Sequence, residues 1–275
     1  MPELPEVETV VRGLSKTIVG HQISKITIKN TARIFPGRAK FKARLSNTKI
    51  KSINRRAKNI LINLSNDYTL WVHLKMTGYF YYRPASTPID KHDHVVFDFT
   101  KNNYNLRFND YRRFGYLKLF PTDEIYNQPG LADLGPEPLD LSAEDFLSMC
   151  QSRSRMIKPA LLDQTFIAGI GNIYADESLY LSRIHPQRLT NSLSSKKLTE
   201  LHGHIQSVLK QAIKLMGTSV DTFAGVNGQP GRYQKYLRAY GREDEPCFRC
   251  GRKIRREKIG SRSAHFCPSC QRISR

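Results

Sequence analysis

The hydrophobic pattern of the first half of the chain is that of one helix followed by short strands. Between Pro5 and Gly20, apolar residues recur at the spacing of one helix face, with proline suited to a first helical turn and glycine to a stop. The segments that follow are rich in β-branched and aromatic residues, which favours antiparallel strands packed into a sandwich or barrel. Examples of these predicted strands are residues 23–28, 60–64, 69–74, 94–99, 104–108 and 116–120.

The second half of the chain is predicted to be helical. Residues 121–138 lose the strand pattern and contain proline and glycine, as a connection between domains does. Residues 142–145, Ser-Ala-Glu-Asp, are similar to a helix capping box, and a long apolar stripe runs from Leu198 to Met216. The glycine-rich stretch 218–232 then indicates a loop. The two halves together predict an α+β protein of two domains.

The charge of the chain narrows the class of its partner. Lys and Arg number 44 against 24 Asp and Glu, a formal net charge of +20. Such a surface attracts a polyanion by counterion release, and nucleic acid is the obvious one, although ribosome contact or simple solubility also accounts for the charge. No apolar run approaches the roughly 20 residues of a membrane span, and the acidic, proline-interrupted start is unlike a signal peptide. We therefore expect a soluble, cytoplasmic protein with no membrane partner.

Four of the five cysteines form two closely spaced pairs near the C-terminus. Two residues separate Cys247 from Cys250, and two separate Cys267 from Cys270. Each pair can lie on a tight turn, and two such turns at the tips of a hairpin can surround one ion tetrahedrally. Four thiolate ligands leave no open coordination position, so this Zn²⁺ is predicted to be structural. Basic residues crowd the same segment, which favours a metal-stiffened β-hairpin that touches DNA.

The N-terminus offers a candidate nucleophile. Met1 precedes the small residue Pro2, so we expect an aminopeptidase to remove it. The secondary amine then exposed has a pKa of about 8, and a fair fraction of it is neutral and nucleophilic near pH 7. Glu3 is adjacent and can move protons. Taken alone, these residues equally fit a short leader into the first helix.

Nine features become informative when they are taken together, in order. They are PELPEVET at 2–9, RRAK at 55–58, HLKM at 73–76, KHDH at 91–94, RRFG at 112–115, LGPEP at 134–138, GIGNIY at 169–174, the stretch 220–240 and the four-cysteine ribbon. Any one of them is a weak signal, but their joint order along nearly the whole chain is specific. On these strings the chain resembles the bacterial formamidopyrimidine-DNA glycosylases.

The resemblance implies roles for four catalytic residues. Pro2 matches the nucleophile that forms a Schiff base, and Glu3 the proton donor in glycosidic cleavage. Lys58, which we expect on the Arg-Arg-Ala-Lys strand, resembles the lysine that assists β-elimination. Arg262 matches the finger arginine that holds phosphate and assists δ-elimination.

The resemblance also implies DNA contacts. A flipped lesion leaves a hole in the stack, which Met76, Arg112 and Phe114 are expected to fill. The residues expected to contact phosphate are His92, Arg113, Arg153 and Asn172. The loop at 218–236 is expected to close over an extruded 8-oxoguanine, with Glu177 near the flipped base.

Two residues depart from the family pattern. Tyr111 stands where relatives often carry proline, so the loop that carries Arg112 is expected to be less rigid. Lys75 stands beside Met76 where glycine is frequent, and it is expected to add a phosphate contact.

The expected architecture is a flanked β-sandwich followed by a helical domain and a finger. We expect a catalytic β-sandwich domain with flanking helices over 1–125, a connection over 126–149, a helix-two-turn-helix DNA-binding domain over 150–240 and a β-hairpin zinc ribbon over 241–275. Double-stranded DNA with oxidised bases or abasic sites is the expected partner. One structural Zn²⁺ and a monomeric state are expected, with no catalytic metal or organic cofactor.

The implied function is that of a bifunctional DNA glycosylase and AP lyase. It would remove 8-oxoguanine and formamidopyrimidines through a Pro2 Schiff base and β,δ-elimination. The sister enzyme endonuclease VIII prefers oxidised pyrimidines, and its opening typically reads Pro-Glu-Gly-Pro-Glu, whereas this chain has Leu4. Charge and cysteines alone also fit a zinc-ribbon protein that binds DNA without catalysis, and Pro2, Glu3 and Lys58 are the residues that discriminate against it.

Overall fold

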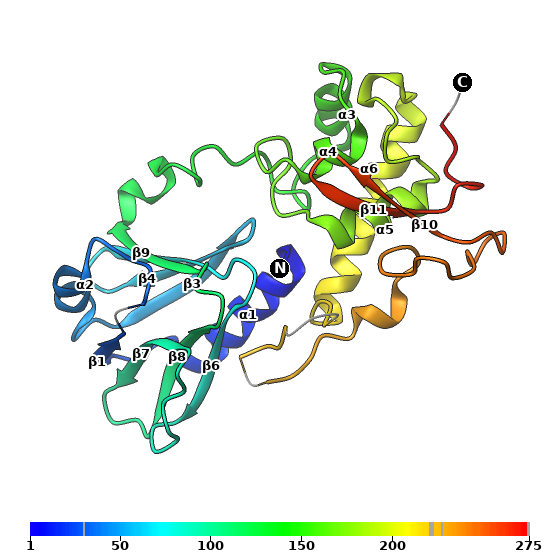
Figure 1. Ribbon diagram of the computed structural model, residues 1–275. Helices are drawn as coiled ribbons and strands as arrows, with labels where there is room; N and C mark the ends of the chain where they lie inside the picture. Colours follow the sequence, from blue (N-terminus) through cyan, green and yellow to red (C-terminus); the bar gives the residue numbers. More distant parts are fainter. Residues whose placement is uncertain (30, 220–222, 227, 274–275) are drawn as a thin grey trace. The chain divides into compact units, whose positions relative to one another are not determined.

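The chain forms two compact units, each with its own buried apolar clusters (Figure 1). The computed structural model describes residues 1–29, 31–219, 223–226 and 228–273. The first unit comprises Met1–Ala132 and Leu215–Arg232, and the second comprises Asp133–Lys214 and Tyr233–Arg275.

The first unit is a two-sheet sandwich with flanking helices α1 (Leu4–Ile18) and α2 (Arg38–Leu45). One sheet has the order β1 (Ile23–Ile28), β7 (Asp93–Phe99), β8 (Tyr104–Asp110), β6 (Gly78–Pro84). The other has the order β2 (Ile34–Phe35), β9 (Tyr116–Pro121), β5 (Tyr68–His73), β4 (Asn59–Leu64), β3 (Ile50–Arg56). Neighbouring strands pair antiparallel except β2 and β9, which pair parallel. A short 3-10 helix, η1 (Thr122–Asn127), follows β9.

Alternation along the strands separates the sandwich core from its outer faces. In β9, Leu117 and Leu119 are buried in the core, whereas the intervening Lys118 is half-buried on the opposite face. Successive strand residues point to opposite faces, so this period of two assigns each side chain to a face. The apolar stripe of α1, including Val7 and Leu14, joins the same core cluster. The leading helix is therefore held against the sandwich by the residues that predicted it.

The second unit is helical and ends in a β-hairpin. Its elements are α3 (Ala143–Gln151), α4 (Ile157–Leu162), α5 (Asn172–Ser182), η2 (Thr190–Ser192), α6 (Ser195–Lys214), η3 (Tyr233–Tyr236), β10 (Arg255–Ile259) and β11 (Arg262–Phe266). Ser142 caps α3, because its hydroxyl accepts the Asp145 backbone N–H at 3.0 Å. Helix α5 packs against both α6 and β11 (Figure 1). The hairpin is therefore attached to the helical body through α5.

The α+β fold with a sandwich, a helical region and a terminal hairpin is confirmed. The compact units do not follow the four expected segments, because spatial contacts define them. Residues 215–232 belong to the first unit, and Val226 lies in its core cluster. Helix α3 begins inside the segment expected to be a connection and belongs to the second unit. No helix among the described residues is long and apolar enough to cross a membrane.

Candidate functional site

The N-terminal residues lie at the start of α1, where Glu6 holds their backbone. Pro2 is buried and precedes the helix N-cap Glu3, which is only 3% exposed. The backbone N–H of Glu3 donates to Glu6 Oε2 at 2.9 Å, and that of Thr218 donates to Glu6 Oε1 at 2.7 Å. Gly217 has φ +79°, and a Cβ there would lie 2.5 Å from Glu6 Oε1. One buried carboxylate therefore ties the candidate nucleophile to the segment that follows α6, a role that the motif did not reveal.

Lys58 lies in the tight turn between β3 and β4, not on a strand as the sequence suggested. Ala57 has a left-handed φ of +53°, which reverses the chain between the two paired strands. Lys58 is 6% exposed. Burial, and then the charges of Lys75 and Lys58, lower the pKa of His73 to about 3. The turn therefore presents a largely buried lysine close to a histidine that is neutral at physiological pH.

Two turns of the first unit carry the residues expected to enter the DNA stack. Met76 lies between β5 and β6 and is 39% exposed, and Phe114 lies between β8 and β9 and is 43% exposed. The Arg112 guanidinium carbon lies 4.8 Å from the centre of the Phe114 ring. Arg113, beside them, is exposed with φ +60°. Met76 and Phe114 are thus too exposed to be core residues, and their side chains are accessible to a ligand.

The buried carboxylate of Asp110 organises both turns. It accepts the Thr77 hydroxyl at 2.5 Å, the Arg112 N–H at 3.2 Å and the Gly115 N–H at 2.7 Å. A side chain at Gly115 would place its Cβ 2.7 Å from the Phe108 ring. The turn that carries Arg112 is thus held by three donors to the one carboxylate of Asp110.

We expect Asp110→Ala to destabilise the protein strongly. Three donors lose their acceptor, two of them in buried hydrogen bonds. Each charge-assisted hydrogen bond is worth about 1.5–3 kcal/mol, so the loss should reach about 3 kcal/mol or more. Urea unfolding followed by circular dichroism measures it. Replacement of the exposed Asp123 by alanine is the control and should change stability by less than about 0.5 kcal/mol. Equal stability of the two variants would contradict this role of Asp110.

A backbone hydrogen bond holds His92 beside Asp110, the last residue of β8. The carbonyl oxygen of His92 accepts the Asp110 N–H at 3.1 Å, and the His92 side chain is half-buried. The preceding loop is fixed by Arg107, which is fully buried and donates to the carbonyl oxygens of Thr87 at 2.6 Å and Pro88 at 2.8 Å. Arg107 also pairs with Asp93 at 3.3 Å. Sequence analysis missed this buried ion pair, because a charged strand residue gives no signal of burial.

In the second unit, Asn172 is the first residue of α5. Gly171 is its N-cap, so Asn172 lies at the positive end of the helix dipole. The Asn172 side-chain oxygen is buried without a hydrogen-bond partner in the part of the chain that the structure describes. Such a terminus favours an anion. Arg153 lies just after α3 and is exposed.

A buried polar cluster joins α5 to the hairpin. Lys158 Nζ lies 2.5 Å from Asp176 Oδ1 and donates to the Ser263 carbonyl at 2.6 Å. Asp176 Oδ2 accepts the His265 backbone N–H at 3.0 Å. Asp176 lies one turn after the start of α5, and Ser263 follows Arg262, which is exposed at the first position of β11. The cluster therefore holds the hairpin end that carries Arg262 against the helix that begins with Asn172.

The hydrogen bonds of Glu177 indicate that its role is structural. Its carboxylate accepts three consecutive backbone N–H groups, from residues 238, 239 and 240, at 2.8–2.9 Å. The side chain is buried, and burial raises the pKa of Glu177 despite these hydrogen bonds. This carboxylate anchors the chain before the cysteine segment, so its contacts within the second unit explain its position.

The four cysteine sulfurs converge. All of them lie within 4.8 Å of one another, and Cys250 Sγ and Cys267 Sγ are 3.5 Å apart. Zinc–thiolate bonds of 2.3 Å place tetrahedral sulfurs roughly 3.8 Å apart, so the set fits one structural Zn²⁺. Burial opposes ionisation of Cys247, but hydrogen bonds from the Tyr180 hydroxyl and from backbone N–H groups lower its pKa to about 6. The pairs flank the open end of the hairpin rather than its tip, which leaves the tip free for Arg262.

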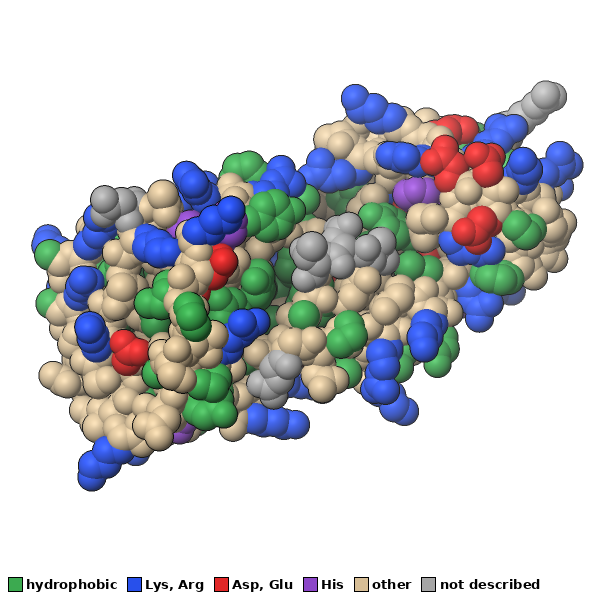
Figure 2. Space-filling model, turned by 60° about the horizontal axis from the view of Figure 1, so that its bottom comes forward, with side chains coloured by type: hydrophobic (Ala, Val, Ile, Leu, Met, Phe, Trp, Pro, Cys, Tyr) green, Lys and Arg blue, Asp and Glu red, His purple; other side chains and the backbone are tan. Residues whose placement is uncertain are grey.

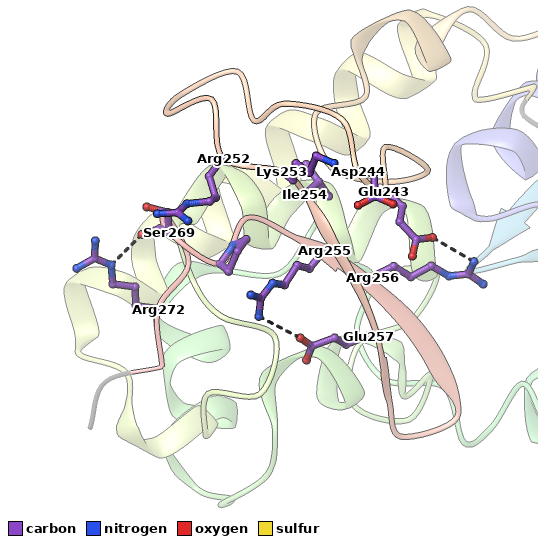
Figure 3. Close-up of a pocket in the computed structure, with 11 residues that line it drawn as sticks. Glu243, Asp244, Arg252, Lys253, Ile254, Arg255, Arg256, Glu257, Ser269 and Arg272 are labelled. Atoms are coloured by element: carbon purple, nitrogen blue, oxygen red, sulfur yellow. Dashed lines mark hydrogen bonds and ion pairs between the residues drawn. The ribbon is translucent and has the colours of Figure 1, made fainter.

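A shallow hollow lies on the zinc ribbon (Figure 3). It has a volume of about 750 Å³ and is lined by five cations and three acids, among other residues. Arg255 lies 4.0 Å from Glu257 and Arg256 lies 3.4 Å from Glu243, so part of its charge is neutralised internally (Figure 3). Figure 2 shows Lys and Arg side chains scattered over both units and far fewer acidic ones. On this face the positive charge is therefore spread over both units rather than confined to the hollow (Figure 2).

The expected lesion loop, 218–236, is described only in part, because residues 220–222 and 227 lie outside the described residues. The Ser219 hydroxyl donates to the Phe223 carbonyl at 2.6 Å and accepts the Gly231 N–H at 2.8 Å. Arg232 N–H donates to the Leu215 carbonyl at 2.8 Å. The two ends of this segment are thus linked to each other.

Comparison with known proteins covers nearly the whole chain. Three family models match: the formamidopyrimidine-DNA glycosylase N-terminal domain at residues 1–117, the formamidopyrimidine-DNA glycosylase H2TH domain at 134–224, and the zinc finger found in FPG and IleRS at 244–273. A formamidopyrimidine-DNA glycosylase of Pelotomaculum thermopropionicum is 45% identical over 99% of this chain and 100% of its own.

Solved structures agree. A Lactococcus lactis enzyme bound to DNA with an abasic site has a TM-score of 0.93 and 38% identity, covering 98% of this chain and 100% of its own. The wild-type Lactococcus lactis enzyme bound to DNA with an oxidised pyrimidine has a TM-score of 0.92 and 37% identity, covering 99% and 100%. The sandwich, the helical unit and the cysteine ribbon thus recur in one order in these proteins, and the chain belongs to the formamidopyrimidine-DNA glycosylase family.

Proposed function

We propose that this protein is a base-excision repair enzyme, a bifunctional DNA glycosylase and AP lyase that removes formamidopyrimidines and 8-oxoguanine by a Schiff base at Pro2. The observation that carries the proposal is the N-terminus. In a chain of this family, Pro2 and Glu3 lie together at the start of α1, and Glu6 holds their backbone in place. No other nucleophile among the described residues combines a family match with a secondary amine.

The chemistry proceeds from the amine that removal of Met1 exposes. The Pro2 nitrogen bonds to C1′ of the lesion nucleotide while the bond from C1′ to the base breaks, and the base leaves with a proton. Glu3 protonates the sugar oxygen as the ring opens, which leaves an iminium ion on Pro2. Both groups are buried, and exclusion of water protects such an intermediate from premature hydrolysis.

Elimination then cuts the strand on both sides. Loss of a C2′ proton breaks the C3′–O bond, with Lys58 assisting proton transfer, and a second elimination breaks the C5′–O bond while Arg262 holds the phosphate. The product is a one-nucleotide gap with phosphate at both ends. The zinc thiolates take no part in these steps, since a closed four-cysteine site has no open position. The metal stabilises the ribbon that presents Arg262.

Access to the lesion requires its nucleotide to leave the stack. Extrusion costs a few kcal/mol, and side chains that fill the vacated space offset that cost. Met76 and Phe114 are exposed apolar side chains that can fill this space, and Arg112, against the Phe114 ring, supplies hydrogen-bond donors for the orphaned base. Phosphate contacts are assigned to His92, Arg113, Arg153 and Asn172.

The experiment that tests this proposal compares the rates at which the protein cleaves DNA with different lesions. We expect nicking of an 8-oxoguanine duplex to be at least about 10-fold faster, in kcat/KM, than nicking of a thymine glycol duplex. Gel separation of labelled strands measures both, and an undamaged duplex is the control. Oxidised pyrimidines are the second candidate class, because a relative has been solved with such DNA. Faster cleavage of the glycol would assign the chain to that class instead.

The proposed setting is the bacterial cytoplasm, where the chromosome is found, and the proposed active form is the monomer. The relatives that match over nearly their full length are bacterial proteins named formamidopyrimidine-DNA glycosylase. Repair of DNA requires access to the chromosome rather than to a membrane or an extracellular substrate.

A further inference from the structure

Three cations surround Tyr116 on the outer face of the second sheet. We call Arg33, Lys75 and Lys118, with Tyr116 between them, the Tyr116 patch. The Lys75 Nζ lies 5.4 Å and the Lys118 Nζ 4.8 Å from the centre of the Tyr116 ring. Arg33 directly precedes β2, and its carbonyl accepts the Leu117 N–H at 3.0 Å, which places it beside Tyr116 on the neighbouring strand. All of these residues belong to the first unit.

The patch holds positive charges together without an acid. Burial, and then the charges of Arg33 and Lys118, lower the pKa of Lys75. Within the described ranges, none of the three cations makes an ion pair with Asp or Glu. Like charges held this close repel one another, and an anion placed among them relieves the repulsion. In the absence of an anion, the face of the Tyr116 ring stabilises the Lys75 and Lys118 ammonium groups by cation–π interactions.

The patch is continuous with the turns that carry the wedge. Lys75 precedes Met76 in the chain, and Tyr116 follows Phe114 by one intervening residue. His73 pairs with Tyr116 across β5 and β9, and their ring centres are 5.6 Å apart. Lys75 is therefore adjacent to Met76, and the Tyr116 ring lies two residues after Phe114, the two side chains that are assigned to the DNA stack.

We propose that the Tyr116 patch binds a phosphate of the DNA backbone that flanks the wedge. The inference rests on the proposed function, because it takes the Met76 and Phe114 turns as DNA contacts. Phosphate fits the chemistry, since it carries a full charge and several acceptors that two ammonium groups and a guanidinium can share. Continuity with the wedge favours DNA over an acidic peptide as the occupant.

The salt dependence of DNA binding tests the patch. The probe is a duplex with one tetrahydrofuran abasic analogue, and the variants are Lys75→Gly, which suits the φ of +54° at this position, and Lys118→Gln. Each lost phosphate contact should lower the slope of log K against log salt by about 0.9 and weaken binding about 5–10-fold at 0.1 M salt. Lys25→Gln, an exposed lysine on β1 of the other sheet, is the control and should leave the slope unchanged.

The possible outcomes distinguish a failure of the proposed phosphate site from a failure of the proposed lyase reaction. Borohydride trapping at saturating abasic DNA should be as efficient in the Lys25→Gln control as in the wild type, because Lys25 belongs neither to the patch nor to the residues assigned to the chemistry. If both variants keep the wild-type slope and affinity while trapping is normal, the patch is not a phosphate site. If the wild type itself fails to trap, the proposed lyase is wrong, and the slopes still decide whether the patch contacts DNA. A lower slope in Lys75→Gly alone supports the site even if Lys118→Gln unfolds.

Discussion

Replacement of Pro2 by glycine should lower the yield of borohydride-trapped complex with abasic or 8-oxoguanine DNA by at least about 100-fold. The change substitutes a primary amine on a flexible residue for a secondary amine held by a ring, so both nucleophilicity and placement are lost. DNA affinity should change less than about threefold, because the basic surface is untouched. Denaturing gels measure the trapped adduct, and fluorescence anisotropy measures binding.

Two controls make the Pro2 experiment decisive. Pro129→Gly, at an exposed turn, removes a proline without touching the N-terminus and should trap normally. A form that retains Met1 keeps Pro2 but converts its nitrogen to an amide, so it should not trap. Mass spectrometry of the reduced adduct then locates the crosslink. A crosslink on Lys58 with an unmodified Pro2 would overturn the assignment of the nucleophile.

The second large effect is expected at the zinc ribbon. Cys247→Ser should lose the metal and weaken DNA binding by about 100-fold, whereas the first unit should remain folded. The hairpin has only a small apolar cluster of its own, around Ile259, Ala264 and Phe266, so thiolate–zinc bonds must supply much of its stability. Loss of the hairpin removes Arg262 and its basic neighbours from the DNA. Metal analysis, anisotropy and circular dichroism measure the three quantities.

Cys150→Ala is the matched control for the ribbon. Cys150 is fully buried and does not belong to the group of four converging cysteine sulfurs. Burial raises the pKa of its thiol to about 12, which disfavours the thiolate that zinc binds. This variant should keep one zinc per chain and wild-type DNA affinity. If Cys247→Ser also kept its zinc and its nicking activity, the four-cysteine site would be wrong.

Much of the architecture could be predicted because its signals are local. The apolar face of α1, the alternation along β9 and the cap at Ser142 are each visible within a few residues of sequence, and the structure uses them as expected. The cysteine spacing likewise predicts its own site, since two residues between thiols suffice to place both on one ion.

The supporting residues of the site could not be predicted, because they act across the fold. Asp110 collects donors from two turns, and Glu6 binds a backbone group that is 212 positions away. Asp176 and Lys158 look like ordinary helix residues in the sequence, yet both are buried and bind the hairpin. A lone charged residue carries no sign of its burial or of its partner, so such contacts appear only once the elements have packed.

The sequence by itself determined that a strand-rich half precedes a helical half and a cysteine ribbon, and it determined the metal ligands and the family, because periodicity, spacing and motif order are properties of the chain. Only the tertiary structure decided that Lys58 lies on a turn, that Glu177 anchors backbone and that Arg33, Lys75 and Lys118 meet around one ring. The physical reason is range: capping and alternation act between near neighbours, whereas burial and charge clustering depend on which distant residues the sheets and helices bring together.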